Sequence, residues 1–146
     1  MSSLVPPTRS RRIFEVLALL AIIASLAFWM RPTQVTIAGV GLGMSQTEVN
    51  KLQEGSDPGE FSTYTSQVEF NQGKVWRVTG HQLEVNGHPV QPDQIRAALG
   101  QPDHTTKARL SADDKAVRLT MSYPQHRLLV QTEPDGGVTY ILFERG

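Results

Sequence analysis

Cysteine is absent from the chain of 146 residues. This absence excludes disulfides, thiolate-based zinc sites, cysteine nucleophiles and the lipid-modified cysteine that bacterial lipoproteins require. Neither sign of charge is in excess, because 14 lysines and arginines face 14 aspartates and glutamates. Since no basic block occurs beyond the first dozen residues, the sequence predicts no nucleic-acid partner. Length and composition indicate one small globular domain, held by its core alone, behind a separate N-terminal segment.

Phosphate-binding motifs are also incomplete. The stretch "GVGLGMSQTEVNKL" (39–52) spaces its glycines as G-x-G-x-G, whereas a dinucleotide fingerprint requires G-x-G-x-x-G inside a βαβ unit. A P-loop requires Lys-Ser or Lys-Thr after its last glycine, and Met44-Ser45 stands there instead. We therefore interpret this stretch as a flexible lead into a helix.

A catalytic set is not evident either. The four histidines lack the i, i+4 helical spacing and the neighbouring carboxylates of metal sites, and are expected in turns and on the surface: His81, His88, His104 and His126. Asp113-Asp114 is expected to form a solvated turn rather than an acid–base pair. Ser45 has no histidine or lysine close in sequence to activate it. The sequence predicts no enzyme, no catalytic residue, no metal site and no cofactor.

A long hydrophobic run dominates the N-terminal part. "IFEVLALLAIIASLAFWM" (13–30) has the length that the hydrocarbon core requires and carries one charge, Glu15. Phe28 and Trp29 stand at its far end, where aromatic side chains favour the membrane interface. More arginines precede the run than follow it, which places the N-terminus in the cytoplasm. We predict a cytoplasmic basic leader at 1–12, a transmembrane signal anchor at 13–30, and an extracytoplasmic remainder.

A cleaved signal peptide is the alternative interpretation of this segment. Ser25-Leu26-Ala27 provides small residues at the positions that a signal peptidase reads. The run is longer than a usual signal-peptide core, however, and the bulky Phe28-Trp29 would follow the cut. With an uncleaved anchor, the protein is a single-pass protein of the inner (plasma) membrane with a periplasmic domain. Its first partner is then the lipid bilayer, through residues 13–30.

The next part reads as a linker or short strand, a helix, and strands. Residues 31–40 alternate enough for a short strand or linker. Ser45 and Glu48 have capping-box spacing, Met44 and Val49 have staple spacing, and Gly55 with Pro58 ends the helix. A hairpin follows over 63–80 with its turn at Asn71-Gln72-Gly73, and Asn86-Gly87 favours a type I′ turn.

The same order recurs in the second half. "VQPDQIRAALGQPD" (90–103) aligns with "MSQTEVNKLQEGSD" (44–57), and "GGVTYI" (136–141) aligns with "GKVWRV" (73–78). Between them, "ARL" and "VRLTM" predict one more hairpin around a polar turn at 112–115. We therefore predict an α+β domain at 41–146, made of one repeat at about 41–88 and a second at about 89–146.

The phrases "GLGMSQTEVNKL", "IRAALGQPD", "GKVWRVTG" and "GGVTYILF" resemble the motifs of the BamE/SmpA/OmlA family and of β-lactamase-inhibitor-protein-like repeats. The resemblance covers about two-thirds of the chain as two copies. It implies two short helical elements packed on one face of an antiparallel sheet, and a role in binding other proteins. The chain departs from the family in lacking a lipobox cysteine, and its first helix ends in "QEGSDPG" instead of "LG.PD".

The function predicted from these observations is a membrane-tethered, non-catalytic protein-interaction module of the bacterial cell envelope with an envelope protein as its partner. The aromatics are expected to pack on the sheet, namely Tyr64, Trp76, Tyr123 and Tyr140, although Trp76 and Tyr140 are also candidates for an exposed partner-binding patch. The alternative is a small envelope enzyme or ligand-binding domain whose site gathers two histidines and acidic side chains from distant positions. A purely structural anchored domain is a third hypothesis.

Overall fold

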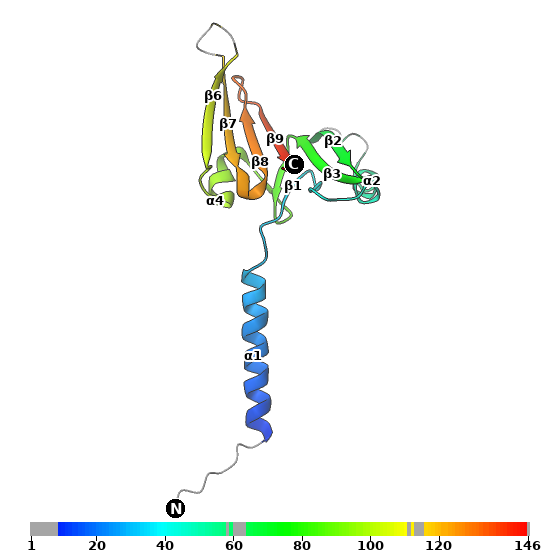
Figure 1. The fold of residues 1–146 in the computed structure, drawn as a ribbon, viewed down its shortest axis with the longest axis vertical. Helices are drawn as coiled ribbons and strands as arrows, with labels where there is room; N and C mark the ends of the chain where they lie inside the picture. The colour runs from blue at the N-terminus through cyan, green and yellow to red at the C-terminus, as the bar shows by residue number, and fades with distance from the viewer. Residues whose placement is uncertain (1–8, 58, 60–63, 111, 113–115, 146) are drawn as a thin grey trace, which may run out of the picture. The chain divides into compact units, whose positions relative to one another are not determined.

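The computed structural model describes residues 9–57, 59, 64–110, 112 and 116–145, drawn as a coloured ribbon in Figure 1. The chain divides into two compact units between Pro32 and Thr33. Some of the predicted features lie outside the described residues. These are Pro58 and, except for Ala112, the predicted turn at 112–115 with its Asp113-Asp114 pair. The basic leader before Arg9 lies outside them as well.

The N-terminal unit contains one long helix, α1 (Arg9–Trp29). Its large apolar side chains are exposed, with exposed fractions from 53% at Ile23 to 86% at Trp29. Arg31 lies over the ring of Phe28, with its guanidinium carbon 5.3 Å from the ring centroid, so the apolar segment ends in a cation–π contact. By length and composition the helix can span a membrane from Arg12 to Trp29, a property that it shares with signal sequences.

The C-terminal unit contains two antiparallel sheets, which makes the chain an α+β protein, as predicted. A three-stranded sheet has the order β1-β4-β5, with β1 (Val35–Ile37), β4 (Leu83–Val85) and β5 (His88–Val90). A six-stranded sheet has the order β2-β3-β9-β8-β7-β6. Its strands are β2 (Thr65–Asn71), β3 (Lys74–Gly80), β6 (His104–Arg109), β7 (Val117–Tyr123), β8 (Leu128–Thr132) and β9 (Val138–Phe143).

Two predicted turns are confirmed by backbone angles. Gln72 and Gly73 join β2 to β3 with φ of 50° and 76°, and Asn86 and Gly87 join β4 to β5 with φ of 52° and 80°. Positive φ at both central residues gives the chain the twist that a two-residue hairpin needs. The additional hairpin is confirmed as well, since β6 and β7 pair antiparallel from His104–Ser122 to Arg109–Val117.

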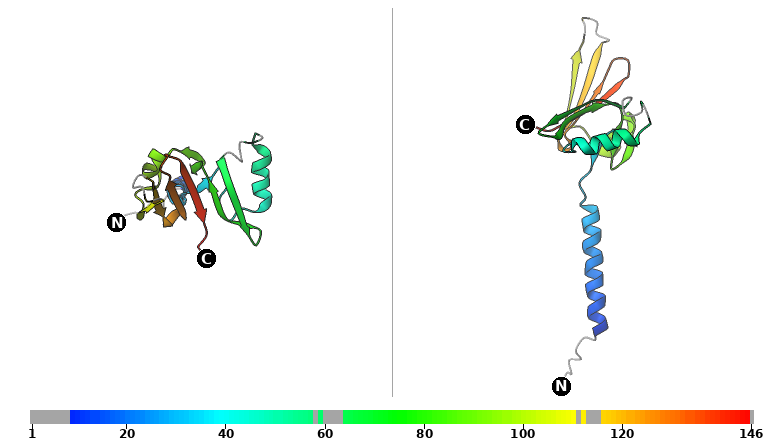
Figure 2. Two further views of the ribbon diagram at one scale, coloured as in Figure 1. Left: turned by 90° about the horizontal axis from the view of Figure 1, so that it is seen from above. Right: turned by 90° about the vertical axis from the view of Figure 1, so that its right-hand side faces the viewer.

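Helix α2 (Gln46–Gly55) begins with the predicted capping box. The Ser45 N–H donates to Glu48 Oε2 over 2.7 Å, and the Glu48 N–H donates to Ser45 Oγ over 3.3 Å. The backbone N–H of Ser45, together with the Ser45 hydroxyl, which donates to the same carboxylate oxygen over 2.8 Å, lowers the pKa of Glu48 from its ordinary value of 4.5. The helix buries Val49, and Figure 2 shows α2 alongside β2 and β3.

Removing the cap is expected to destabilise the C-terminal unit. Ser45→Ala deletes the hydroxyl that accepts the Glu48 N–H, and loss of such a cap costs about 1 kcal/mol. Urea unfolding followed by circular dichroism measures the change. Gln53→Ala, an exposed substitution near the other end of α2, is the control and is expected to leave the midpoint unchanged. An equal loss in both variants would contradict the capping role.

The glycine-rich stretch before α2 is fixed against β3. The Gly43 N–H donates to the Val75 carbonyl over 2.8 Å, and the Val75 N–H donates to the Met44 carbonyl over 2.8 Å. Gly43 adopts a φ of 82°, which favours glycine. The Gly43 N–H, which would point at the anion in a phosphate-binding loop, is therefore hydrogen-bonded to β3 instead.

The second helical element starts with a 3₁₀ turn, η1 (Pro92–Gln94), and continues as α4 (Ile95–Leu99). The Gln91 N–H donates to Gln94 Oε1 over 3.1 Å, in the direction that the sequence pattern predicts. Gly100 ends the helix with a φ of 83°. The α-helical part is short because the 3₁₀ turn occupies its beginning, as is frequent at helix starts.

The core follows one row across the six-stranded sheet. Val78, Leu142, Leu128 and Tyr123 are successive Cα partners on β3, β9, β8 and β7, and each is at most 1% exposed. Ile95 from α4 is fully buried in the same cluster, as are Ile37, Val40, Val75 and Leu83, with Val49, Val130 and Tyr140 nearly so.

The two buried tyrosines confirm the expected sheet packing. Tyr140 is 1% exposed because it shares the core face of β9 with Leu142, two residues away. It therefore offers no exposed ring in this structure, in contrast to the partner-binding position considered for it. Tyr123 is also 1% exposed, and its hydroxyl has no hydrogen-bond partner among the described residues.

Tyr123→Phe is expected to stabilise the protein. Burying a hydroxyl that has no hydrogen-bond partner costs its desolvation free energy, and no hydrogen bond offsets this cost. Its removal is therefore expected to raise the free energy of unfolding by about 1 kcal/mol. Chemical denaturation of the full chain in detergent micelles provides the measurement. Tyr140→Phe is the matched control, because the Tyr140 hydroxyl is not among the buried unpartnered atoms, and a smaller gain is expected there.

Alkaline pH is expected to destabilise the C-terminal unit. Burial raises the pKa of the Tyr123 hydroxyl above its ordinary value of 10.0, although Arg96 offsets part of the shift, and burial raises the pKa of Tyr140 as well. Above pH 10 the unfolded chain loses these protons first, so stability is present below pH 10 and falls as pH rises through the folded-state pKa values. Unfolding midpoints measured from pH 8 to 11 test this slope, which Tyr123→Phe is expected to reduce.

Candidate functional site

A hollow of about 410 Å³ opens on the C-terminal unit, within the range of small-molecule sites. Three segments that are distant in sequence form its walls. They contribute Tyr64, His81 and Gln82; Pro89, Val90, Gln91 and Pro92; and Gly136, Val138 and Tyr140. The first and third segments meet because β3 and β9 are neighbours in the six-stranded sheet, and the second lies beside the first because β5 pairs with β4, with Val90 opposite Leu83.

His81 lies at the first wall, directly after β3. Its N–H donates to the Tyr64 carbonyl over 2.8 Å, which joins the two ends of the β2–β3 hairpin. Its Nδ1 lies 3.1 Å from the Val138 carbonyl oxygen. Because a carbonyl only accepts, Nδ1 carries the proton of this hydrogen bond, and the imidazole is held against β9. The ring orientation is thus fixed by the fold.

The second wall is the segment from β5 into η1. Pro89 and Pro92 have no N–H to donate, so this wall presents carbonyls and apolar ring surfaces, with Gln91 between them. Pro89 lies on β5 opposite Glu84, and the Asn86-Gly87 turn fixes this register. The wall is therefore set by a tight hairpin.

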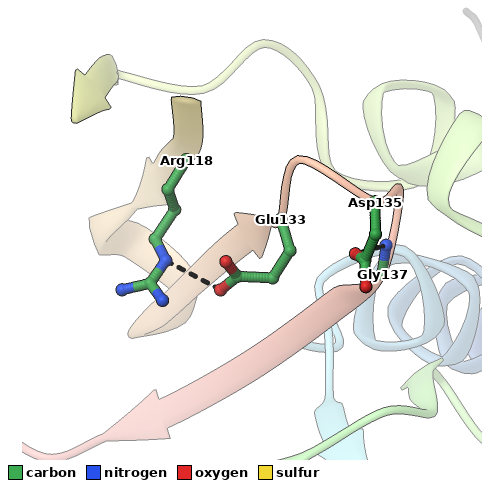
Figure 3. A network of polar contacts seen from close by, with 4 residues as sticks. All are labelled: Arg118, Glu133, Asp135 and Gly137. Carbon is green, nitrogen blue, oxygen red and sulfur yellow. Dashed lines mark hydrogen bonds and ion pairs between the residues drawn. The ribbon is translucent and has the colours of Figure 1, made fainter. Parts of the chain in front are cut away.

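The third wall is the turn between β8 and β9, part of which is drawn in Figure 3. Asp135 Oδ1 accepts the Gly137 N–H over 2.9 Å, and Gly136 adopts a φ of 90°. One strand away, Arg118 Nε donates to Glu133 Oε1 over 2.7 Å (Figure 3). The ion pair and the side-chain turn hold the loop that carries Gly136 to the hollow.

The chemistry of this hollow is neutral and polar. Among the described residues that line it there is no aspartate, glutamate, lysine or arginine, and His81 is the only histidine. A second hollow of about 200 Å³ contains His126 beside Arg127, and the lining residues that the structure describes include no acidic one. Neither hollow gathers two histidines with carboxylates, as the enzyme hypothesis requires. Within the described part of the chain, no three potential metal ligands cluster.

The two predicted partner-binding aromatics occupy different places. Trp76 is half-buried on β3, where its carbonyl accepts the Glu144 N–H over 2.8 Å, and it lines neither hollow. Tyr140 is buried and contributes to the first hollow from below the surface. Tyr64, expected to pack on the sheet, is 37% exposed at the rim.

Sequence patterns did not identify the remaining lining residues. Gln82 and Pro89 lie on either side of the predicted Asn86-Gly87 turn, but the meeting of the first and third walls depends on the adjacency of β3 and β9, which no local pattern encodes. Comparison of the chain with protein-family models, with curated proteins and with solved structures finds no match in any of the three.

Proposed function

We propose that this protein is a membrane-tethered, non-catalytic interaction module of the bacterial cell envelope. The observation that carries the proposal is α1, whose apolar side chains are exposed and whose length matches that of a bilayer. A compact α+β unit follows this helix directly. A tether of this kind raises the local concentration of a binding domain at the membrane, so a modest interface suffices.

The proposed orientation places the N-terminus in the cytoplasm of an inner-membrane protein and the α+β unit outside. The arginines before the apolar run support it through the positive-inside rule. The Arg31–Phe28 contact at the opposite end is of the kind expected where a helix leaves the bilayer.

The proposed architecture is a pair of repeats related to the BamE/SmpA/OmlA and β-lactamase-inhibitor-protein-like pattern, with both helical elements on one sheet face. Three features support it. β3 and β9, which hold most of the matching "GKVWRV" and "GGVTYI" phrases, pair with each other as neighbouring inner strands of the sheet. Val49 from α2 and Ile95 from α4 enter the same buried cluster. Both helical elements begin with a polar side chain that accepts a backbone N–H across three positions.

Crosslinking in native membranes tests the interaction role. A photoreactive residue placed at Trp76 in the full chain, expressed at its native level, is expected to capture a recurrent envelope protein. The matched control carries the photoreactive residue at Gln53 on the exposed surface of α2, where no such product is expected. Recovery of the protein alone from both positions would count against the proposal.

A further inference from the structure

The two edges of the six-stranded sheet differ in their suitability for pairing with another strand. β2 forms one edge, and its register shifts twice, between Thr65 and Gln67 and between Glu69 and Phe70. Such irregularities blunt an edge against further pairing. β6 forms the other edge and pairs with β7 over six consecutive residues without a shift. Figure 1 shows β6 as the outermost strand on its side of the sheet.

β6 is uncovered on both of its faces. All six of its residues are exposed, which holds for no other strand whose side chains are fully described. The Leu110 N–H donates to the Ala116 carbonyl over 2.8 Å, and bonded positions alternate along an antiparallel ladder. Thr106 and Ala108 therefore direct their backbone groups to β7, while Thr105 and Lys107 direct theirs to the open side.

We propose that β6 pairs antiparallel with β6 of a second copy of this chain, so that the two six-stranded sheets join at this edge. The two strands can bond only in registers that place residues with open-side backbone groups, such as Thr105 and Lys107, opposite each other. An axis at Lys107 would put two like charges face to face, which is unfavourable. An axis at Thr106 instead sets Thr105 opposite Lys107 in both directions, and places Asp103, the residue before β6, opposite the oppositely charged Arg109 of the second copy.

The absence of native cysteine makes the register directly measurable. In the Thr106-centred pairing the two Thr106 residues form a non-hydrogen-bonded pair with Cα atoms about 4.5 Å apart, which a disulfide can bridge. The two Lys107 residues are not opposite each other, because each faces Thr105 of the other copy. They are offset by about 7 Å along the strands, so cysteines at this position cannot form a disulfide without backbone movement. The inference depends on neither the membrane tether nor a foreign partner.

The experiment uses the purified full chain in detergent micelles under mild oxidation. Thr106→Cys is expected to give at least about tenfold more disulfide-linked dimer than Lys107→Cys, or than Gln67→Cys on the opposite edge strand β2. Adding Lys107→Pro to Thr106→Cys removes an outward N–H that β7 does not use, so the dimer is expected to disappear while circular dichroism stays unchanged.

Equal crosslinking of Thr106→Cys and Gln67→Cys would overturn the proposal, because it would reflect random collision. Stronger crosslinking of Lys107→Cys than of Thr106→Cys would overturn the register. Capture of a different protein in place of a second copy would overturn the proposal, because β6 would then pair with a strand of another protein. If the proline variant fails to fold, the comparison of the three single cysteine variants still decides. None of these outcomes bears on whether Trp76 contacts an envelope partner.

Discussion

Leu20→Asp combined with Ile22→Asp is expected to release the protein from membranes. Both side chains are more than half exposed near the middle of α1. On insertion scales a charge at the centre of a spanning helix costs about 2.5–3.5 kcal/mol, so two of them outweigh the gain from the surrounding leucines and isoleucines. Alkaline extraction and flotation then find the double variant in the soluble fraction and the wild type in the membrane fraction.

The matched control changes the same two positions without charge. Leu20→Ala with Ile22→Ala keeps the helix apolar and is expected to remain in the membrane fraction. Mass spectrometry of the mature wild type distinguishes the two interpretations of α1. An intact N-terminal segment supports the anchor, whereas a mature protein that begins near Phe28 would show a cleaved signal peptide.

Leu128→Ala is expected to cost about 3 kcal/mol of unfolding free energy, because it opens a cavity in the centre of the core row. Leu128 is 1% exposed and lies between Leu142 and Tyr123 on the neighbouring strands. Its neighbours belong to rigid strands, so the site can collapse only in part.

Fluorescence of Trp76 reports this unfolding once Trp29→Phe removes the other tryptophan. Leu129→Ala is the matched control, since Leu129 is adjacent on β8 but faces the opposite side of the sheet and is only half-buried. A similar loss in both variants would mean that the core face of β8 has been wrongly assigned.

Local elements were predictable because their signals are short-range. The Ser45–Glu48 capping box, the Asn86-Gly87 turn and the helix stop at Gly100 each depend on residues within a few positions, and the structure has all three. The apolar run of α1 was equally visible from composition.

The arrangement of the sheets was less predictable, because it depends on contacts between distant residues. Strand periodicity indicated hairpins but did not reveal that β1, β4 and β5 form a sheet of their own. Alternation also left the two faces of β9 undecided, so Tyr140 was a candidate for exposure until its neighbour Leu142 fixed the core side. The hollow around His81 was invisible for the same reason.

The central position of β9 also constrains the order of folding. Residues 77 and 143 pair across β3 and β9, so the β2–β3 hairpin cannot join the rest of its sheet until the last strand has been made. Contacts of such long sequence separation are slow to form because loop closure must precede them. Until then, the inner sides of β3 and β8 both lack a neighbour, and the incomplete chain is most vulnerable to aggregation at this stage.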